Sequence, residues 1–281
     1  MSAFRPCILV PTYDNPRTVR DVVSRAREQL AAFPGAERGA VVVVDDGSGP
    51  EGRRAVEELG RDGLAHVAHR ARNGGKGAAV KTGFAFAREL GYSHALQVDA
   101  DGQHALEDVP KFLEVARENP SGLVLGQPLF DGTAPIGRKN GRQITIFWTW
   151  VEAGSAIGAA MCGFRVYPLD AALRAAGPTG DRMDFDPEIA VRIAWTGAPV
   201  IQIPTSVRYV SRDEGGVSHF KLFLDNWLIS RMHTRLVWHR AISTIFRRPL
   251  VPALAPPIEL GRDVVAKPAV AALPADARDP R

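Results

Sequence analysis

The chain has 281 residues, of which 45% are hydrophobic and 23% are charged. This length allows one large domain or two small ones, and the ordinary composition excludes collagen-like, coiled-coil and wholly disordered proteins. Two cysteines, Cys7 and Cys162, are too few for a disulfide framework. No apolar run reaches the roughly 18 residues of a membrane span, and no signal peptide is recognisable. We therefore expect a globular, cytoplasmic protein.

The first half of the chain alternates apolar strands with amphipathic helices. Short apolar runs predict strands at 8–11, 41–44, 64–68, 95–98 and 123–125. Helical spacing predicts one helix that Asp14 or Asn15 caps and Pro16 begins, a second that ends before Gly91, and a third over 106–118. This alternation is typical of an α/β protein with a mostly parallel sheet flanked by helices. Ligands of such sheets bind at the carboxyl ends of the strands.

The second half is less regular. We expect a Trp-rich helix near 141–156, a strand-like stretch at 162–167, a helix over 186–195 and a long helix over 218–246. These elements divide the chain into an α/β domain over 1–217, an amphipathic basic helix over 218–248 and a disordered, Pro/Ala-rich tail over 249–281.

The positive charge of the chain lies around the long helix. Residues 206–248 contain eight Lys and Arg against three Asp and Glu, whereas the rest contains 27 basic and 28 acidic residues. One side of the helix carries Phe220, Leu224, Trp227, Trp238, Ile242 and Ile245, and the opposite side carries Leu222, Ile229, Met232 and Leu236. Two apolar stripes predict two contacts, one with the domain and one with another partner. A lipid acceptor or the inner face of the cytoplasmic membrane is one such partner, and burial in the domain or in a homodimer is the alternative. Nucleic acid is not expected, because the aromatic residues follow the helical period.

An acidic motif follows the strand at 95–98. Asp99 and Asp101 stand two residues apart, Gly102 permits a turn, and Gln103 adds a neutral oxygen. Oxygen ligands of this kind suit Mg²⁺ or Mn²⁺, which commonly bridge to phosphates. A solvated turn is the alternative interpretation.

Two further loops carry polar or glycine-rich sequences. Asp45 and Asp46 end a run of four valines and could accept hydrogen bonds from a base or ribose, or cap a helix. Residues 73–77, Asn-Gly-Gly-Lys-Gly, open a helix, so their backbone N–H groups and Lys76 could bind a phosphate. The spacing is not that of a Walker A loop.

In this order, the strings ILVPTYDNP, VVVVDDGSG, ARNGGKGAAVKTGF and LQVDADGQH resemble glycosyltransferase family 2, in particular its dolichyl-phosphate mannose synthase-like branch. The resemblance implies a GT-A fold, which is Rossmann-like, and a nucleotide-sugar donor. It also implies that Pro11, Tyr13, Asp45 and Asp46 hold the nucleotide. Asp99, Asp101 and Gln103 would hold the metal and the diphosphate, and Lys76 would either bind the donor or order its loop.

The second half, with MCGFRVYP, MDFDPEIAVR and GVSHFKLFLDNWLISRMHTRL, is similar to glycosyltransferases of bacterial aryl-polyene and related lipid-pigment pathways. Arg138 and Arg142, four residues apart, could reach a diphosphate or form a solvated basic face. One departure is notable: an acidic residue usually precedes the C-G-F-R string, and here Ala159 and Ala160 stand there.

An inverting transfer to a hydroxyl needs a carboxylate as base, for which Asp184, Asp186 and Glu188 are candidates. Asp186 precedes Pro187 at a predicted helix start, so it could instead be an N-cap. A phosphate acceptor would need no base. We therefore expect a metal-dependent, inverting glycosyltransferase with a lipid or lipid-like acceptor. The alternatives are a polyprenyl-phosphate glycosyltransferase and a nucleotide-sugar-binding protein without activity. The sequence leaves the donor sugar and the oligomeric state open.

Overall fold

The computed structural model describes residues 4–36, 39–129, 136–155, 157–207, 221–247, 259–261 and 263–269, without the side chains of 136–142 and 222. The strands are β1 (Pro6–Thr12), β2 (Val41–Asp45), β3 (His66–Arg70), β4 (His94–Gln97), β5 (Leu123–Leu129), β6 (Arg165–Pro168), β7 (Val200–Ser206) and β8 (Val264–Lys267). The helices are α1 (Val19–Ala31), α2 (Pro50–Arg61), α3 (Lys76–Glu89), α4 (Val109–Glu118), α5 (Ile136–Ala153), α6 (Leu169–Ala176), α7 (Phe185–Trp195) and α8 (Leu222–Ile245), with a 3₁₀ turn, η1, at Leu106–Asp108.

The strands form one sheet in the order β7-β5-β6-β4-β1-β2-β3-β8. The pairs of β1 with β2 and β4, β2 with β3, and β5 with β7 are parallel, whereas β6 and β8 run antiparallel to their neighbours. Because β6 is reversed, the residues that precede it reach the same edge of the sheet as the carboxyl ends of β1, β2, β3 and β4. The predicted α/β fold with a mostly parallel sheet is confirmed.

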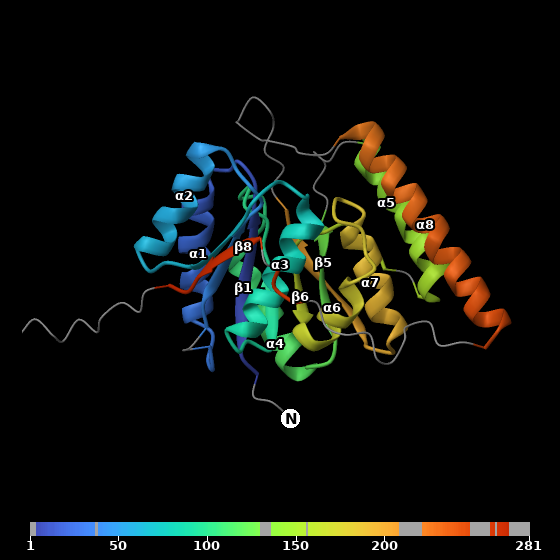
Figure 1. Cartoon of the computed structure of the whole chain (residues 1–281). Helices are drawn as coiled ribbons and strands as arrows, with labels where there is room; N and C mark the ends of the chain where they lie inside the picture. The colour runs from blue at the N-terminus through green and yellow to red at the C-terminus, as the bar shows by residue number, and fades with distance from the viewer. Residues whose placement is uncertain are drawn as a thin grey trace, which may run out of the picture.

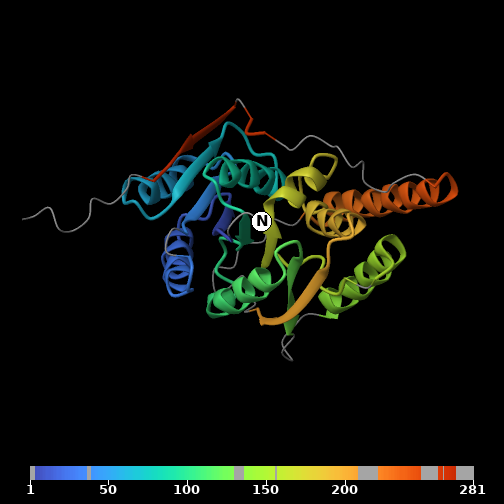
Figure 2. The same ribbon diagram turned by 90° about the horizontal axis from the view of Figure 1, so that it is seen from below.

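Helices cover both faces of this sheet. Helices α1 and α4 pack together on one face, and α3, α6 and α7 pack on the other (Figure 2). The continuous apolar strands β1 and β2 are buried on both faces for this reason. Helices α5 and α8 stand beyond one end of the sheet, opposite α1 and α2 (Figure 1).

The structure confirms the five strands predicted in the first half within two residues at their starts and bears out the predicted end of the second helix. Helix α3 ends at Glu89, and Gly91 follows in the left-handed region with φ of +82°. A side chain at this position would strain the backbone, so glycine stops the helix here.

The predicted start of the first helix at Pro16 is wrong, because α1 begins at Val19. Asp14 does not cap the helix: its Oδ1 accepts the backbone N–H of Gly49 at 2.8 Å, and its own N–H donates to the Ser48 hydroxyl at 2.9 Å. The side chain that resembles a cap in the sequence therefore joins this loop to the loop after β2.

Helix α8 has the two faces that its stripes predict. Met232 and Leu236 are buried in the domain core, whereas Trp227, Trp238 and Ile245 are more than half exposed. The inner stripe packs on the domain together with α5 and α7. Phe220 lies outside the described residues, and the side chain of Leu222 is not described.

Part of the predicted disordered tail is ordered, which corrects the prediction for 249–281. Residues 264–267 form β8, which pairs antiparallel with β3 so that Val265 faces His69 in the register. The N–H of Ala269 also donates to His66 Nδ1 at 2.7 Å. The high Pro and Ala content hid a short Val-Val-Ala-Lys strand, which is stable only because the edge of β3 offers free backbone partners. Most of the remaining tail lies outside the described residues.

The two faces of α8 predict that replacing a leucine by alanine lowers the free energy of unfolding more on the buried face than on the exposed one. We expect Leu236→Ala, at a fully buried position, to lower the free energy of unfolding by about 3 kcal/mol because it leaves a cavity. Leu224→Ala, at a position that is 41% exposed, is the matched control and should change it by about 0.5 kcal/mol. Urea denaturation of both variants measures the difference, and equal losses would contradict the assignment of the faces.

Candidate active site

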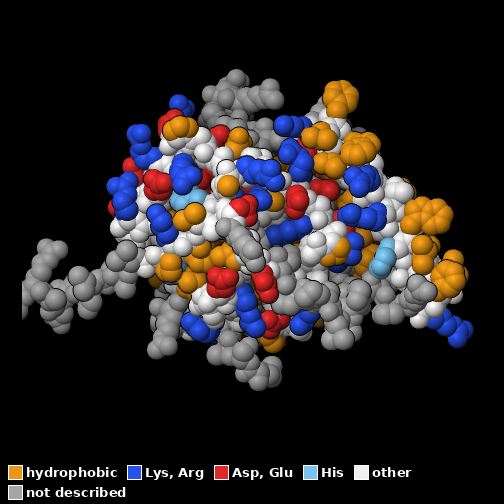
Figure 3. Space-filling view, in the orientation of Figure 1, with side chains coloured by type: hydrophobic (Ala, Val, Ile, Leu, Met, Phe, Trp, Pro, Cys, Tyr) orange, Lys and Arg blue, Asp and Glu red, His pale blue; other side chains and the backbone are white. Residues whose placement is uncertain are grey.

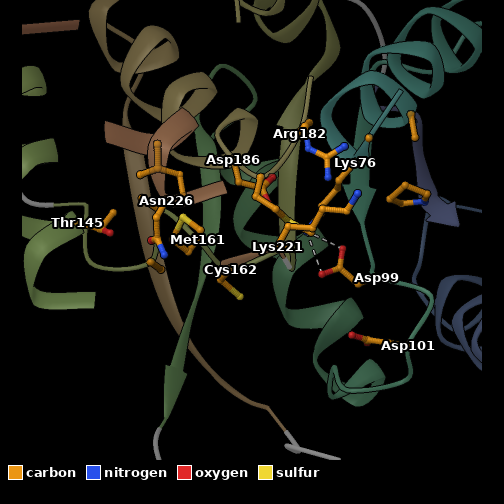
Figure 4. A pocket seen from close by; sticks show the side chains of 18 of the residues that line it. Lys76, Asp99, Asp101, Thr145, Met161, Cys162, Arg182, Asp186, Lys221 and Asn226 are labelled. Carbon is orange, nitrogen blue, oxygen red and sulfur yellow. Dashed lines mark hydrogen bonds and ion pairs between the residues drawn. The ribbon is translucent and has the colours of Figure 1, made fainter. Parts of the chain in front are cut away.

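A cavity of about 1290 Å³ opens at the carboxyl ends of β1, β2, β3 and β4 (Figure 4). The loops after these strands, the segment before β6 and the start of α7 line one end of it, and α5 and α8 line the other. The loop residues include Pro11, Tyr13, Asn15, Asp46, Asn73, Lys76, Asp99, Asp101, Gln103 and His104. The residues of α5 and α8 include Thr145, Trp148, Asn226, Ile229, Ser230, His233, Val237 and Trp238. The predicted ligand-binding edge of the sheet therefore carries the cavity.

Asp45 does not contribute its side chain to this cavity. Its carboxylate is fully buried, lies 2.9 Å from His69 Nδ1 and accepts the backbone N–H of Ser48 at 2.9 Å. Burial raises the pKa of Asp45, but these two hydrogen bonds outweigh it and hold the pKa below its ordinary value. The structure thus gives no support to a nucleotide contact by this carboxylate, because the hydrogen bonds tie β2 to β3.

Asp46 borders the cavity and organises the glycine loop. Its carboxylate accepts the N–H of Gly75 at 2.7 Å and that of Gly74 at 3.1 Å, and it pairs with the Arg70 guanidinium. Burial raises the pKa of Asp46 although all three donors favour the ionised form. The side chain therefore fixes the backbone that carries Lys76.

Lys76 joins two carboxylates at the polar end of the cavity. Its Nζ lies 2.9 Å from Asp99 Oδ1 and 2.9 Å from Asp186 Oδ2, and Figure 4 shows the three side chains close together. Burial disfavours the ammonium, but Asp186 and Asp99 raise the pKa of Lys76 above its ordinary value. Lys76 thus links α3 to the loop after β4 and to α7.

The acidic loop after β4 fits a divalent cation. Burial opposes ionisation of Asp99, but Lys76 and His104 hold its pKa well below its ordinary value. Burial and the charge of Asp99 raise the pKa of Asp101, so the two carboxylates repel each other. A hard cation would relieve this repulsion, and carboxylate oxygens are its preferred ligands. Gln103 also faces the cavity.

Of the three candidate bases, Asp186 alone faces the cavity. It is 3% exposed and its Oδ1 lies 3.9 Å from Arg165 Nη2. It is not the N-cap of α7, because the N-cap residue is Asp184. The carboxylate of Asp184 accepts the N–H of Arg182 at 3.2 Å within the turn before the helix.

Glu188 is buried away from the cavity, which corrects its assignment as a candidate base. Its carboxylate accepts Arg192 Nε at 2.7 Å and the N–H of Gly180 at 3.0 Å, and it pairs with Arg235 of α8. The side chain therefore joins α7 to α8. About half a helical turn, from Asp186 to Glu188, separates the carboxylate that faces the cavity from the structural one.

Three basic residues that sequence reasoning did not select complete the site. Arg182 and Lys221 line the cavity beside Lys76 (Figure 4). Arg165 is fully buried and donates to the carbonyls of Ala160 at 3.0 Å, Cys162 at 2.8 Å and Asp186 at 2.9 Å. The place of Arg165 in the C-G-F-R string and that of Lys221 in the basic stretch 206–248 were available signals, whereas Arg182 lies in neither.

The segment before β6 brings small residues to the cavity. Ala159 and Ala160 line it, at the place where the family resemblance led us to expect an acid. A Cβ on Gly163 would lie 2.3 Å from Asp99 Oδ2, so only glycine leaves room for that carboxylate. The side chains of Arg138 and Arg142 lie outside the described residues, although their backbone belongs to α5.

Residues 7–165, more than half of the chain, match the model of the family described as Glycosyl transferase family 2. The chain belongs to this family and is a glycosyltransferase. It is 29% identical over 224 residues to an undecaprenyl-phosphate mannosyltransferase of Micrococcus luteus, which covers 75% of this chain and 86% of that protein. It is 34% identical over 131 residues to a polyprenol monophosphomannose synthase of Mycolicibacterium smegmatis, which covers 46% of each chain.

Solved structures share the fold at low identity. A mannosyl-3-phosphoglycerate synthase from Rubrobacter xylanophilus gives a TM-score of 0.60 at 14% identity, over 91% of this chain and 78% of that one. A glucosyl-3-phosphoglycerate synthase from Mycobacterium tuberculosis, in complex with Mn²⁺, UDP and glucosyl-3-phosphoglycerate, gives 0.57 at 14% identity, over 95% and 91%. These comparisons confirm the GT-A-like fold.

The contacts of Glu188 predict a structural role that can be measured without substrate. We expect Glu188→Gln to lower the free energy of unfolding by about 3 kcal/mol, because it removes the negative charge that pairs with Arg192 and Arg235. The matched control is Glu57→Gln, which removes an exposed pair with Arg53 at the same spacing and should cost less than about 1 kcal/mol. A Glu188→Gln protein as stable as the control would show that this network is unimportant.

Proposed function

We propose that this chain transfers a sugar, with inversion, from a nucleoside diphosphate sugar to the phosphate of a polyprenyl phosphate. The observation that carries the proposal is the composition of one cavity: acidic and basic groups at the sheet edge continue into an end where apolar side chains of α5 and α8, such as Trp148, Ile229 and Val237, stand among polar ones. A charged head with a long apolar chain matches such a cavity. The names of the two relatives above support the same acceptor class.

The acidic end suits the donor. Asp99, Asp101 and Gln103 would hold Mg²⁺ or Mn²⁺, which would stabilise the leaving diphosphate electrostatically. Among the residues that the structure describes, no cluster of three His, Cys, Asp or Glu side chains could hold a metal by itself. Oxygens of the donor would therefore complete the coordination. Pro11 and Tyr13 border the same end and would contact the nucleotide.

The contacts of Asp186 favour a phosphate acceptor over a hydroxyl. The Asp186 carboxylate already pairs with the Lys76 ammonium at 2.9 Å, so it would have to give up this ion pair to take a proton from an acceptor hydroxyl. A phosphate is already ionised at neutral pH and needs no base. Lys221 and Arg182 line the cavity and would neutralise the acceptor phosphate. A hydroxyl acceptor of the aryl-polyene type is less well supported.

The outer surface of α5 and α8 suits a membrane. Exposed apolar side chains gather there, next to Lys and Arg, as Figure 3 shows. They are Ile144, Phe147 and Trp150 of α5, and Phe223, Leu224, Trp227, Trp238, Ile242 and Ile245 of α8. No helix in the described part of the chain is long and apolar enough to span a membrane. We propose that this surface rests on the membrane that holds the acceptor, so that the lipid reaches the end of the cavity that α5 and α8 line.

The transfer can be tested directly. Purified protein with Mn²⁺ or Mg²⁺ should move the labelled sugar of GDP-mannose or a UDP-sugar onto undecaprenyl phosphate and release the nucleoside diphosphate. We expect Asp101→Asn to lower the rate by about 100-fold or more, because it removes one oxygen ligand of the cation. Glu57→Gln, far from the cavity, is the control.

Each negative result separates the alternatives. A protein that binds a nucleoside diphosphate but transfers sugar to neither a polyprenyl phosphate nor a lipid hydroxyl would be a binding protein without activity. Transfer to the hydroxyl only would overturn the proposed acceptor.

The membrane contact makes its own prediction. We expect Ile245→Glu to weaken binding to phosphatidylglycerol vesicles by about tenfold, since a buried Ile contributes roughly 1.5–3 kcal/mol. Ile245 is 72% exposed on α8, and Val265→Glu, at a 53% exposed position on β8, is the control at the other end of the molecule. Vesicle sedimentation measures both, and equal binding of the two variants would argue against this surface.

A further inference from the structure

The ammonium of Lys76 contacts Asp99, one of the carboxylates that would bind a divalent cation. It donates to Asp99 at 2.9 and 3.0 Å and contacts Asp186 at 2.9 Å. The Lys76 side chain is only 17% exposed, so water screens these ion pairs weakly. His104 Nε2 also lies 3.3 Å from Asp99 Oδ2. Both oxygens of this carboxylate therefore already have a partner.

The backbone holds Lys76 in this position. Asp46 accepts the N–H groups of Gly74 and Gly75, the two residues before it. On the other side, Ala78 N–H donates to the carbonyl of Asp181 at 3.0 Å. These hydrogen bonds fix the backbone of Lys76 between the acidic loop and α7. The Lys76 side chain is therefore held in contact with both Asp99 and Asp186.

A cation at Asp99 would meet this ammonium at close range. Two positive charges that share one carboxylate repel each other strongly where water is scarce. The nucleoside diphosphate brings negative charge of its own, which would attract both the ammonium and the cation. Because the diphosphate offsets the repulsion between the cation and the ammonium, the cation should bind more tightly when the diphosphate is also bound.

We propose that Lys76 makes divalent-cation binding depend on the nucleotide: it competes for Asp99 until a diphosphate supplies the missing negative charge, and then contacts that diphosphate. This inference rests on the proposed function, because it concerns the donor of that same site. The consequence is that a free cation binds weakly, so the protein does not load metal in the absence of donor. Lys76 is here a positioning residue for the acidic loop and a donor contact.

The test measures Mn²⁺ binding, from the electron paramagnetic resonance signal of free Mn²⁺, without nucleotide and with UDP or GDP. We expect Lys76→Met to bind Mn²⁺ without nucleotide about tenfold or more tightly than the wild type, because the competing charge is gone. The gain in affinity on adding nucleotide should shrink by a similar factor. Lys76→Arg, which keeps the charge, should retain the weak nucleotide-free binding.

Lys81→Met is the matched control. Lys81 lies on the same helix, is 13% exposed, and pairs with Asp181 at 3.1 Å and with the carbonyl of Thr179. The Lys81→Met substitution also removes one positive charge, but at a site away from the acidic loop. It should therefore leave Mn²⁺ binding unchanged. Thermal melting of each variant shows that the protein is folded.

The proposal is overturned if folded Lys76→Met binds Mn²⁺ without nucleotide no more tightly than the wild type, or if Lys81→Met shows the same gain. These outcomes are distinct from failure of the proposed function. If neither nucleotide binds the wild type, the proposed donor site fails, while the nucleotide-free comparison still decides whether Lys76 opposes the cation.

Discussion

A buried ammonium needs negative partners, and in this protein those partners come from distant parts of the chain. Lys76 at the start of α3 binds Asp99 after β4 and Asp186 in the first turn of α7. Because an unpaired charge at this depth would be very unfavourable, the three elements must keep their relative positions. The polar end of the cavity, and with it the room for a donor, depends on this one set of ion pairs.

The other end of the cavity depends on helix α8, which makes polar contacts with the domain and exposes large apolar side chains on its outer face. Polar side chains on the inner side of α8 reach buried carboxylates of the domain: His233 Nδ1 lies 2.7 Å from Glu152, and Arg235 pairs with Glu188. Large apolar side chains, among them Trp227 and Trp238, face outward. These polar contacts, together with buried Met232 and Leu236, fix the helix to the domain, while the outer apolar side is left for another surface. The proposed lipid acceptor would account for that outer side.

Much of the site followed from the order of loops along the chain. Asp99 and Asp101 could be assigned to one edge of the sheet because they follow a buried strand, and the carboxyl ends of parallel strands meet there. The same reasoning failed for Asp45 and Glu188. Each lies close in sequence to a cavity residue, yet each is turned into the protein by a partner. For Asp45 this partner is His69 on the neighbouring strand, and for Glu188 it is Arg192 one turn along the same helix, with Arg235 of α8.

The sequence by itself determined the five strands of the first half, the loops that carry the ligands and the two stripes of α8, because these depend on local composition and spacing. Only the tertiary structure decided which carboxylate faces the cavity, that Arg165 braces the site from within, and that a short strand in the tail completes the sheet at β3. The physical reason is that the direction of a charged side chain is set by its partner. That partner is 23 residues away for Lys76 and Asp99, and 47 for Arg235 and Glu188.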